Sequence, residues 1–319
     1  MKVSGLILCS ITFAAYAEEP TEAQARALSA AVAAAPRLDL LASPLSLSLR
    51  APAAGWKIGY PSSVAMAESG EIYILQRDDT ADPVIAADKS GRVLRSWGKG
   101  LFRIPHAIRI DPQGNIWTVD AGNSMIYEFN PAGKKVLEIS VGEQPAGKTG
   151  FTGTTDIAFA PNGHLYISDG YGNARVLEYT RDGKRLRQWG EEGTGRGQFR
   201  QPHGIAVDDK GTVYVADRLN GRLQWFSAEG KYLGEWDALG MVTTVAFRDG
   251  ALWIGTQQRN QPTSADGWLM KIDRQTGKIL GIVESAQGHH VLNVAGNQLL
   301  SGARPDVVLW FRAPQGAAR

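Results

Sequence analysis

The sequence predicts an all-β fold, a six-bladed β-propeller with a short N-terminal helical lead-in. The first observation is that one pattern recurs six times: a short apolar strand, a polar turn with glycine, and a second apolar strand. The second is the composition of the 319 residues, in which 37 glycines and 9 tryptophans favour a β fold rich in turns. A third strand, a hairpin and a fourth strand follow most copies. Six four-stranded units of about 40 to 50 residues are typical of a propeller.

The six copies can be aligned on the glycine of the turn between the first and second strands. They span Ser62–Arg77, His106–Ala121, Thr155–Tyr171, His203–Arg218, Thr243–Gln257 and His290–Gly302. The fourth strand of a unit ends near a tryptophan, as at Trp97, Trp189 and Trp236. We assign residues 57–313 to the propeller and 314–319 to a C-terminal tail.

The segment 18–56 comes before the repeats and is expected to close the ring. Thr21 to Ala35 is alanine-rich, with Thr21 as a capping residue, and predicts a helix. The strictly alternating Leu45–Leu49 predicts a strand. The sixth copy ends after its third strand, Val307–Phe311, so Leu45–Leu49 would supply the missing fourth strand and remove an exposed edge.

Residues 1–17 have the layout of a secretory signal peptide. Lys2 precedes the apolar residues 6–15, and Ala15-Tyr16-Ala17 has the form of a cleavage site. The single cysteine, Cys9, lies inside this segment; a lipoprotein is the alternative, which Leu8 disfavours because a small residue is expected there. We therefore expect an exported protein, periplasmic or secreted, without disulfides and without a membrane span. The formal charge of +2, with scattered basic residues, gives no indication of nucleic-acid binding.

The most regular copy is similar to a known family of repeats. The segment Gly193–Ile205 has the form Gly-x-Gly-x-Gly-Gln-Phe-x-x-Pro-His-Gly-Ile, and Val215-Ala216-Asp217 and Asn220-Gly221-Arg222 follow it. These motifs resemble the NHL-repeat family. The resemblance implies a six-bladed propeller and no particular function.

Three of the five histidines begin the first strand of a copy. They are His106, His203 and His290, in the second, fourth and sixth copies, whereas the odd copies carry Ser62, Thr155 and Thr243. Alternate blades of a six-bladed ring lie about 120° apart, so the three imidazoles would converge at one mouth of the channel. The small hydroxyl residues between them would leave space. Three histidines with an open position form a typical catalytic zinc site, although imidazole also suits other divalent transition metals.

Each of these residues also has a non-functional interpretation. Pro-His-Gly-Ile can be a common opening of a blade in which the histidine caps a loop. His289 is the rival of His290 as the third ligand, because the sixth copy is short and its register could differ by one residue. His164 follows the turn Asn162-Gly163, where a solvent-facing histidine without a function is expected.

The segments around the histidines resemble the lyase domain of the peptidyl-α-hydroxyglycine α-amidating lyase family. The motifs that carry the resemblance are RIPHAIRID around His106, RQPHGIAVD with VADRLNGR around His203, and DGYGNARV at Asp169–Val176. The resemblance implies a six-bladed propeller with a three-histidine zinc site. It implies that Tyr171 is the catalytic tyrosine and that Arg77 and Arg218 are active-site arginines.

The positions of these three residues agree with such roles. Each falls just past the end of a second strand, in a loop, and that strand returns to the mouth that holds the histidines. Arginine binds a carboxylate through two parallel hydrogen bonds, so an anionic substrate is expected. A divalent cation and the arginines near Tyr171 should lower its pKa and make it a base. The alternatives are ion pairs of the arginines with Asp78, Asp79 or Asp217, and a tyrosine that only packs in its loop.

The chain also departs from that family. The family has an acid after its third histidine, tied to a structural calcium, and Val291 stands there in this chain, so calcium is not expected. The family's disulfides are missing. We expect no copper monooxygenase domain ahead of the propeller, so the substrate can differ.

These observations define three hypotheses for function. The first is a zinc-dependent lyase that cleaves an α-hydroxyglycine-type carbinolamide with a terminal carboxylate to an amide and glyoxylate. The second is a non-catalytic propeller that binds a protein or other ligand on one face. The third, a gluconolactonase-like hydrolase, ranks lowest because the blade openings lack an acid-rich set of calcium ligands.

Overall fold

The computed structural model describes residues 22–38, 40–45, 49, 52–77, 80–142, 150–248, 250–257, 267–285, 289–295, 298–303 and 307–312. The predicted signal peptide, Thr21 and the predicted tail at 314–319 lie outside these ranges. Among the described residues, no helix has the length and hydropathy that crossing a membrane requires.

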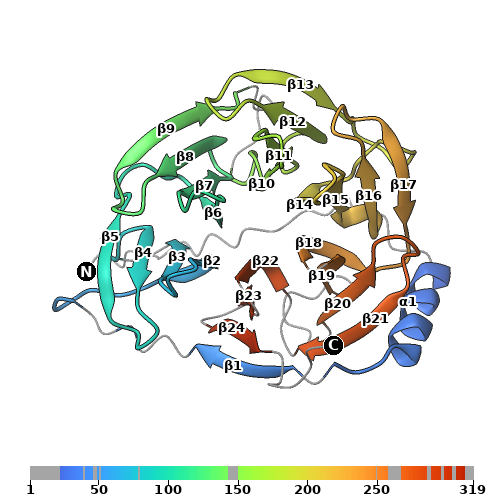
Figure 1. Ribbon diagram of the computed structural model, residues 1–319, viewed down its shortest axis with the longest axis horizontal. Coiled ribbons are helices and arrows are strands. Elements are labelled where there is room, and N and C mark those ends of the chain that lie inside the picture. Colours follow the sequence, from blue (N-terminus) through green and yellow to red (C-terminus); the bar gives the residue numbers. More distant parts are fainter. Residues whose placement is uncertain are drawn as a thin grey trace, which may run out of the picture.

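The described strands form six four-stranded antiparallel sheets arranged around a central axis (Figure 1). Five of them, blades 1 to 5, are built from four consecutive strands each. Blade 1 holds β2 (Tyr60–Met66), β3 (Ile72–Arg77), β4 (Val84–Ala87) and β5 (Val93–Trp97). Blade 2 holds β6 (Pro105–Ile110), β7 (Ile116–Asp120), β8 (Met125–Phe129) and β9 (Lys135–Ser140). Blade 3 holds β10 (Asp156–Phe159), β11 (Leu165–Asp169), β12 (Arg175–Tyr179) and β13 (Arg185–Trp189).

Blade 4 holds β14 (Pro202–Val207), β15 (Val213–Asp217), β16 (Arg222–Phe226) and β17 (Tyr232–Trp236), with the short 3₁₀ turn η1 (Arg218–Asn220) after β15. Blade 5 holds β18 (Met241–Arg248), β19 (Ala251–Gln257), β20 (Gly267–Asp273) and β21 (Ile279–Ser285). Blade 6 joins β22 (His289–Ala295), β23 (Gln298–Ala303) and β24 (Val307–Arg312) to the N-terminal strand β1 (Leu41–Leu45). The prediction of an all-β propeller is confirmed.

The proportion of apolar residues in a strand reflects its distance from the axis. The second strands β7, β11 and β15 are buried along their whole length, because neighbouring blades cover both of their faces. Their sequences are accordingly apolar on consecutive positions, as expected for strands that are covered on both sides. The outermost strand β9, by contrast, exposes most of its residues and carries lysine and glutamate.

The N-terminal segment closes the ring in the predicted manner, with a different strand. Strand β1 pairs with β24 in antiparallel register from Leu41↔Arg312 to Leu45↔Val308, and so gives blade 6 its fourth strand. The prediction of Leu45–Leu49 was wrong by four residues, since the ladder with β24 selects Leu41–Leu45; residues 46–48 lie outside the described ranges. Alternation along the sequence could not indicate which stretch would reach the edge of β24.

The predicted helix is present as α1 (Glu22–Ala34), on the outside of the ring beside blades 4 and 5 (Figure 1). Its Leu28 and Val32, one turn apart, are buried in the core cluster that also contains Val242 and Leu252 of blade 5. The chain after the helix then runs along β21, where Leu38 N donates to Ile282 O over 2.9 Å. The lead-in therefore covers the outer edge of blade 5 before it becomes part of blade 6.

Tryptophans at the ends of the fourth strands connect successive blades. Each one ends its strand, as predicted, and packs against a left-handed turn glycine in the following blade. The pairs are Trp97 with Gly133, Trp189 with Gly230 and Trp236 with Gly277. A Cβ on these glycines would lie 3.0 Å, 2.7 Å and 2.3 Å from the indole atoms, so glycine is needed both for its positive φ and for the close approach.

We expect that a chain beginning at Leu49 is much less stable than one beginning at Leu40. The first lacks β1 and leaves β24 as an unpaired edge, whereas the second lacks only α1 and the segment along β21. Thermal unfolding and light scattering of both chains measure the difference. Equal melting temperatures would show that β1 does not close the ring.

Candidate active site at the mouth of the channel

Each histidine of the alternate-blade set occupies a β-bulge at the start of an innermost strand. In blade 2, Pro105 pairs with Asp120 and Ala107 with Val119, which leaves His106 as the extra residue. The register of β22 is interrupted in the same way at His290, and the register of β14 is interrupted at His203 and Gly204. A bulge leaves one residue unpaired and re-aims its side chain, so it explains how a strand residue points toward the axis.

The register also decides between the two adjacent histidines of blade 6. His289 takes part in the ladder opposite Ala303, and His290 occupies the bulge. His290, and not His289, is thus the equivalent of His106 and His203. The sequence had left this choice open.

The three imidazoles converge as the repeat predicts. One ring nitrogen from each of His106, His203 and His290 lies within 4.8 Å of the others. The ring centroids are 5.0 Å apart for His106 and His203, 4.6 Å for His106 and His290, and 5.0 Å for His203 and His290. His106 and His203 are buried, with exposed fractions of 0% and 1%. His164 lies apart from this cluster, where its Nδ1 contacts Glu178 Oε1 over 2.7 Å.

The other ring nitrogen of each histidine is held by the next blade. Nδ1 of His106 lies 2.6 Å from Thr155 O, Nδ1 of His203 lies 2.6 Å from Thr243 O, and Nδ1 of His290 lies 3.3 Å from Ser62 O. A carbonyl oxygen can only accept, so Nδ1 carries the proton and Nε2 is left with its lone pair. The residues of the odd blades thus do more than leave space, because their backbone fixes the tautomer in which Nε2 can bind a metal.

A second set of hydrogen bonds holds the remaining blade boundaries. In each, a side-chain oxygen of an odd blade accepts the backbone N–H two residues after a histidine. The pairs are Ile108 N with Ser63 Oγ at 3.1 Å, Ile205 N with Asp156 Oδ2 at 3.4 Å, and Leu292 N with Thr244 Oγ1 at 2.9 Å. Together the two sets give the channel a nearly threefold pattern of contacts.

Burial and neighbouring charge keep two of the histidines neutral. Desolvation lowers the pKa of His106 well below its ordinary value, and His290, His203 and Arg77 lower it further. The pKa of His203 is also lowered well below the ordinary value by desolvation, with His290 and Arg218 acting in the same direction. Neutral imidazole is the form that binds a metal ion.

Tyr171 lies against the histidine cluster. Its hydroxyl oxygen is 3.0 Å from His106 Nε2 and 3.1 Å from His203 Nε2. Burial raises the pKa of Tyr171, while the positive charges of Arg218 and Arg77 lower it by a smaller amount. The two arginines therefore do not by themselves lower the pKa of Tyr171, because desolvation of the phenolate outweighs both of them.

Both predicted arginines lie beside Tyr171. Arg77 is stacked between two aromatic rings, with its guanidinium carbon 4.8 Å from the centre of the Tyr60 ring and 5.0 Å from that of Phe151. Arg218 donates to Gln201 Oε1 over 3.2 Å. Among the described residues, Nη1 of Arg77 and Nε of Arg218 are buried and make no hydrogen bond. Two guanidiniums, each with a buried N–H group at the same mouth, are suited to bind an anionic ligand.

Aspartates at the ends of two second strands anchor the loops that carry Tyr171 and Arg218, a role that was not predicted from the sequence. Asp169 Oδ2 accepts from Asn173 Nδ2 over 2.8 Å and from Arg175 Nε over 2.9 Å. In blade 4, Asp217 pairs with Arg222 over 2.7 Å rather than with Arg218, which removes that alternative for Arg218. The recurring Asp, Asn and Arg of DGYGNAR and DRLNGR were the available signal.

The histidine cluster fits a zinc ion. It offers three imidazole nitrogens whose second ring nitrogens are fixed by carbonyls, as is usual around histidine-bound zinc. One hydroxyl proton, from Tyr171, is available to the two Nε2 atoms of His106 and His203, so a cation would satisfy lone pairs that the protein does not.

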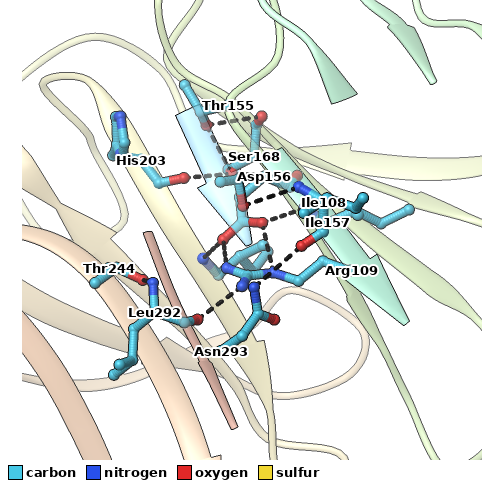
Figure 2. Close-up of polar contacts among 12 residues, drawn as sticks. Ile108, Arg109, Thr155, Asp156, Ile157, Ser168, His203, Thr244, Leu292 and Asn293 are labelled. Atoms are coloured by element: carbon cyan, nitrogen blue, oxygen red, sulfur yellow. Dashed lines mark hydrogen bonds and ion pairs between the residues drawn. The ribbon is translucent and has the colours of Figure 1, made fainter. Parts of the chain in front are cut away.

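A structural calcium does not fit the channel in the same way. The carbonyls of Val64, Ile108 and Leu292, each two residues after a blade opening, already accept hydrogen bonds. Asn293 Nδ2 donates to Val64 O over 2.6 Å. It also donates to Ile108 O over 3.1 Å, and Arg109 Nη1 donates to Leu292 O over 2.7 Å (Figure 2). Nitrogen donors occupy oxygens of the kind that calcium binds.

Comparisons with known proteins define the class of propeller to which the fold belongs. Residues 199–226 match the NHL repeat. A Staphylococcus aureus virginiamycin B lyase has the same fold, with a TM-score of 0.58 and 15% identity over 86% of this chain and 99% of that one. A structure described as streptogramin B lyase gives 0.60 and 15% over 86% and 97%. These define an NHL-type propeller.

Relatives with similar sequences identify the family. The chain is 30% identical over 250 residues to the Caenorhabditis elegans protein named "Probable peptidyl-alpha-hydroxyglycine alpha-amidating lyase pgal-1", covering 72% of this chain and 69% of that protein. It therefore belongs to the peptidyl-α-hydroxyglycine α-amidating lyase family. It is also 38% identical over 155 residues to the Xenopus laevis peptidyl-glycine alpha-amidating monooxygenase A, over 46% of this chain and 16% of that much longer protein.

We expect the metal-free protein to lose stability as the pH falls below about 6.5, the pKa of histidine in an unfolded chain. His106 and His203 have lowered pKa values in the fold, so only the unfolded state takes up their protons in this range. Each adds about 1.4 kcal/mol of lost stability per pH unit until it is protonated in the fold. Urea unfolding at several pH values should show a shallower slope for His106→Gln, and an unchanged slope would contradict the assignment.

We also expect Gly170→Ala to disturb the Tyr171 loop. A Cβ at this glycine would lie 1.8 Å from Pro202 O, next to His203, so the backbone must shift. The cost is about 1 to 3 kcal/mol, as for other overpacked sites, and is measured by urea unfolding. Gly195→Ala is the control, since its Cβ would meet only the side chain of Gln198.

Proposed function

We propose that this protein is a metal-dependent lyase acting on an α-hydroxyglycine-type carbinolamide with a free carboxylate. The observation that carries the proposal is the convergence of His106, His203 and His290 from alternate blades, beside Tyr171, in a chain of the amidating-lyase family. Zinc, the role of each site residue and export from the cytoplasm are parts of this proposal.

Arg77 and Arg218 would bind the substrate carboxylate. Both contribute positive charge at Tyr171, and each has a buried nitrogen without a hydrogen bond among the described residues. A carboxylate would satisfy these donors and offset the repulsion between two guanidiniums. The ring stacking of Arg77 on Tyr60 and Phe151 holds its plane without using its N–H groups.

Tyr171 would accept the proton of the substrate hydroxyl. His106, His203 and His290 would hold zinc, which when bound supplies a Lewis acid for that hydroxyl and a positive charge that lowers the pKa of Tyr171. As the hydroxyl proton leaves to the Tyr171 oxygen, the C–O bond becomes a C=O bond and the C–N bond breaks. The amide nitrogen takes up this proton from Tyr171, so the products are an amide and glyoxylate and Tyr171 returns to its starting state.

A binding propeller without catalysis is the second candidate. The chain is 31% identical over 182 residues to the mouse NHL repeat-containing protein 3, covering 53% of this chain and 52% of that protein. The name of that relative refers to its repeat and to no enzymatic reaction. A protein or ligand bound on one propeller face would then be independent of the three histidines.

Metal analysis and a glyoxylate assay test the lyase proposal. The purified protein should contain about one zinc ion per chain and release glyoxylate from an α-hydroxyglycine peptide. His203→Ala should lose the metal and reduce the rate by at least about 100-fold, the order expected when a group that stabilises the transition state is removed.

His164→Ala is the matched control, since this histidine lies outside the cluster and should retain metal and rate. Wild-type protein without metal and without glyoxylate release would reject the lyase. Capture of a partner by the triple histidine variant as well as by the wild type would then support the binding propeller.

A further inference from the structure

A buried polar cluster lies along the channel, and the proposed reaction does not use it. Figure 2 shows Arg109 between Asp156 and Leu292, with Asn293 alongside. Arg109 and Asp156 have exposed fractions of 8% and 3%. Nε and Nη2 of Arg109 donate to the two carboxylate oxygens of Asp156 over 2.9 Å and 2.5 Å, a bidentate pair.

The cluster contacts all three strands that carry the histidines. Arg109 comes three residues after His106 on β6, and its Nη1 reaches Leu292 O, two residues after His290 on β22. Asp156 Oδ2 also accepts from Ile205 N over 3.4 Å, two residues after His203 on β14. Blades 2, 4 and 6 are not neighbours in the ring, so these contacts link the histidine strands across the axis.

Asn293 extends the cluster to blade 1. Its amide nitrogen donates to Val64 O and Ile108 O, which belong to β2 and β6. One amide and one guanidinium thus bind three inward-facing carbonyls and a carboxylate, a set of oxygens that would otherwise suit a hard cation. Burial raises the pKa of Asp156 and Arg109 lowers it, so the guanidinium compensates the cost of the buried carboxylate.

We propose that Arg109, Asp156 and Asn293 form a metal-free pin that takes the place of a structural cation in the channel and fixes the relative positions of the three histidine strands. The part that concerns metal binding by the histidines rests on the proposed function. The structural part does not, and the two are tested separately.

Calcium rescue of Arg109→Met tests the structural part. This variant removes the guanidinium and leaves the Asp156 carboxylate and Leu292 O facing one another, so its melting temperature should fall in metal-depleted buffer and recover when calcium is added. The double variant Arg109→Met/Asp156→Asn lacks the carboxylate and should not respond to calcium. The wild type should show the same melting temperature with and without calcium.

Three results would overturn the pin. They are stabilisation of the wild type by calcium, a wild-type melting temperature for Arg109→Met without calcium, and equal rescue of the double variant. Arg109→Lys guards against a single variant that fails to fold, since it keeps the charge and loses the forked contacts. It should have an intermediate melting temperature and no calcium response, and a calcium response would count against the proposal.

Metal affinity tests the positioning of the histidines. Cobalt(II), titrated as a spectroscopic probe, should bind Arg109→Met about tenfold more weakly than the wild type, the order seen when support around metal ligands is lost, and calcium should restore the affinity. Arg274→Met is the control, because Arg274 pairs with Asp208 and Asp209 outside the pin. Unchanged cobalt affinity in Arg109→Met would reject positioning. A wild type that binds no cobalt would count against the proposed function while leaving the calcium test valid.

Discussion

The site depends on the hydrogen bonds that alternate from one blade boundary to the next around the channel. At three boundaries a histidine Nδ1 faces the backbone carbonyl of the following blade, and at the other three a side-chain oxygen accepts a backbone N–H from the histidine's strand. The same contacts that join the blades therefore orient the imidazoles. Folding of the ring and formation of the three-histidine cluster are one event, since neither set can form in an isolated blade.

This arrangement gives the two kinds of blade different tasks. Even blades supply the nitrogen donors, and odd blades supply the carbonyls that fix their tautomer. Arg77, at the end of β3, and the loops that carry Tyr171 and Arg218 meet at the same mouth, and Asp169 and Asp217 hold these two loops. Chemistry and anchoring are thus divided between neighbouring residues of one motif, as in DGYGNAR with Asp169 and Tyr171.

Along the channel, the near threefold pattern is broken at one position. Ser63 and Thr244 are small hydroxyl residues, whereas the equivalent residue of blade 3 is Asp156, which requires the charge of Arg109. The ion pair and Asn293 occupy inward-facing oxygens of the channel, so a chain of this family can hold its innermost strands together with its own nitrogen donors. The carbonyls that a cation would bind are instead satisfied by the protein.

The sequence by itself determined the repeat, the strand order within each blade and the alternate placement of the histidines, because these follow from spacing and alternation. Tertiary structure decided what depends on contacts between distant segments. The ladder with β24 selected Leu41–Leu45 as the closing strand, and the bulge register selected His290 over His289. Burial, which no local pattern reports, raised the pKa of Tyr171 against the two arginines and brought Arg109, Asp156 and Asn293 together across the axis.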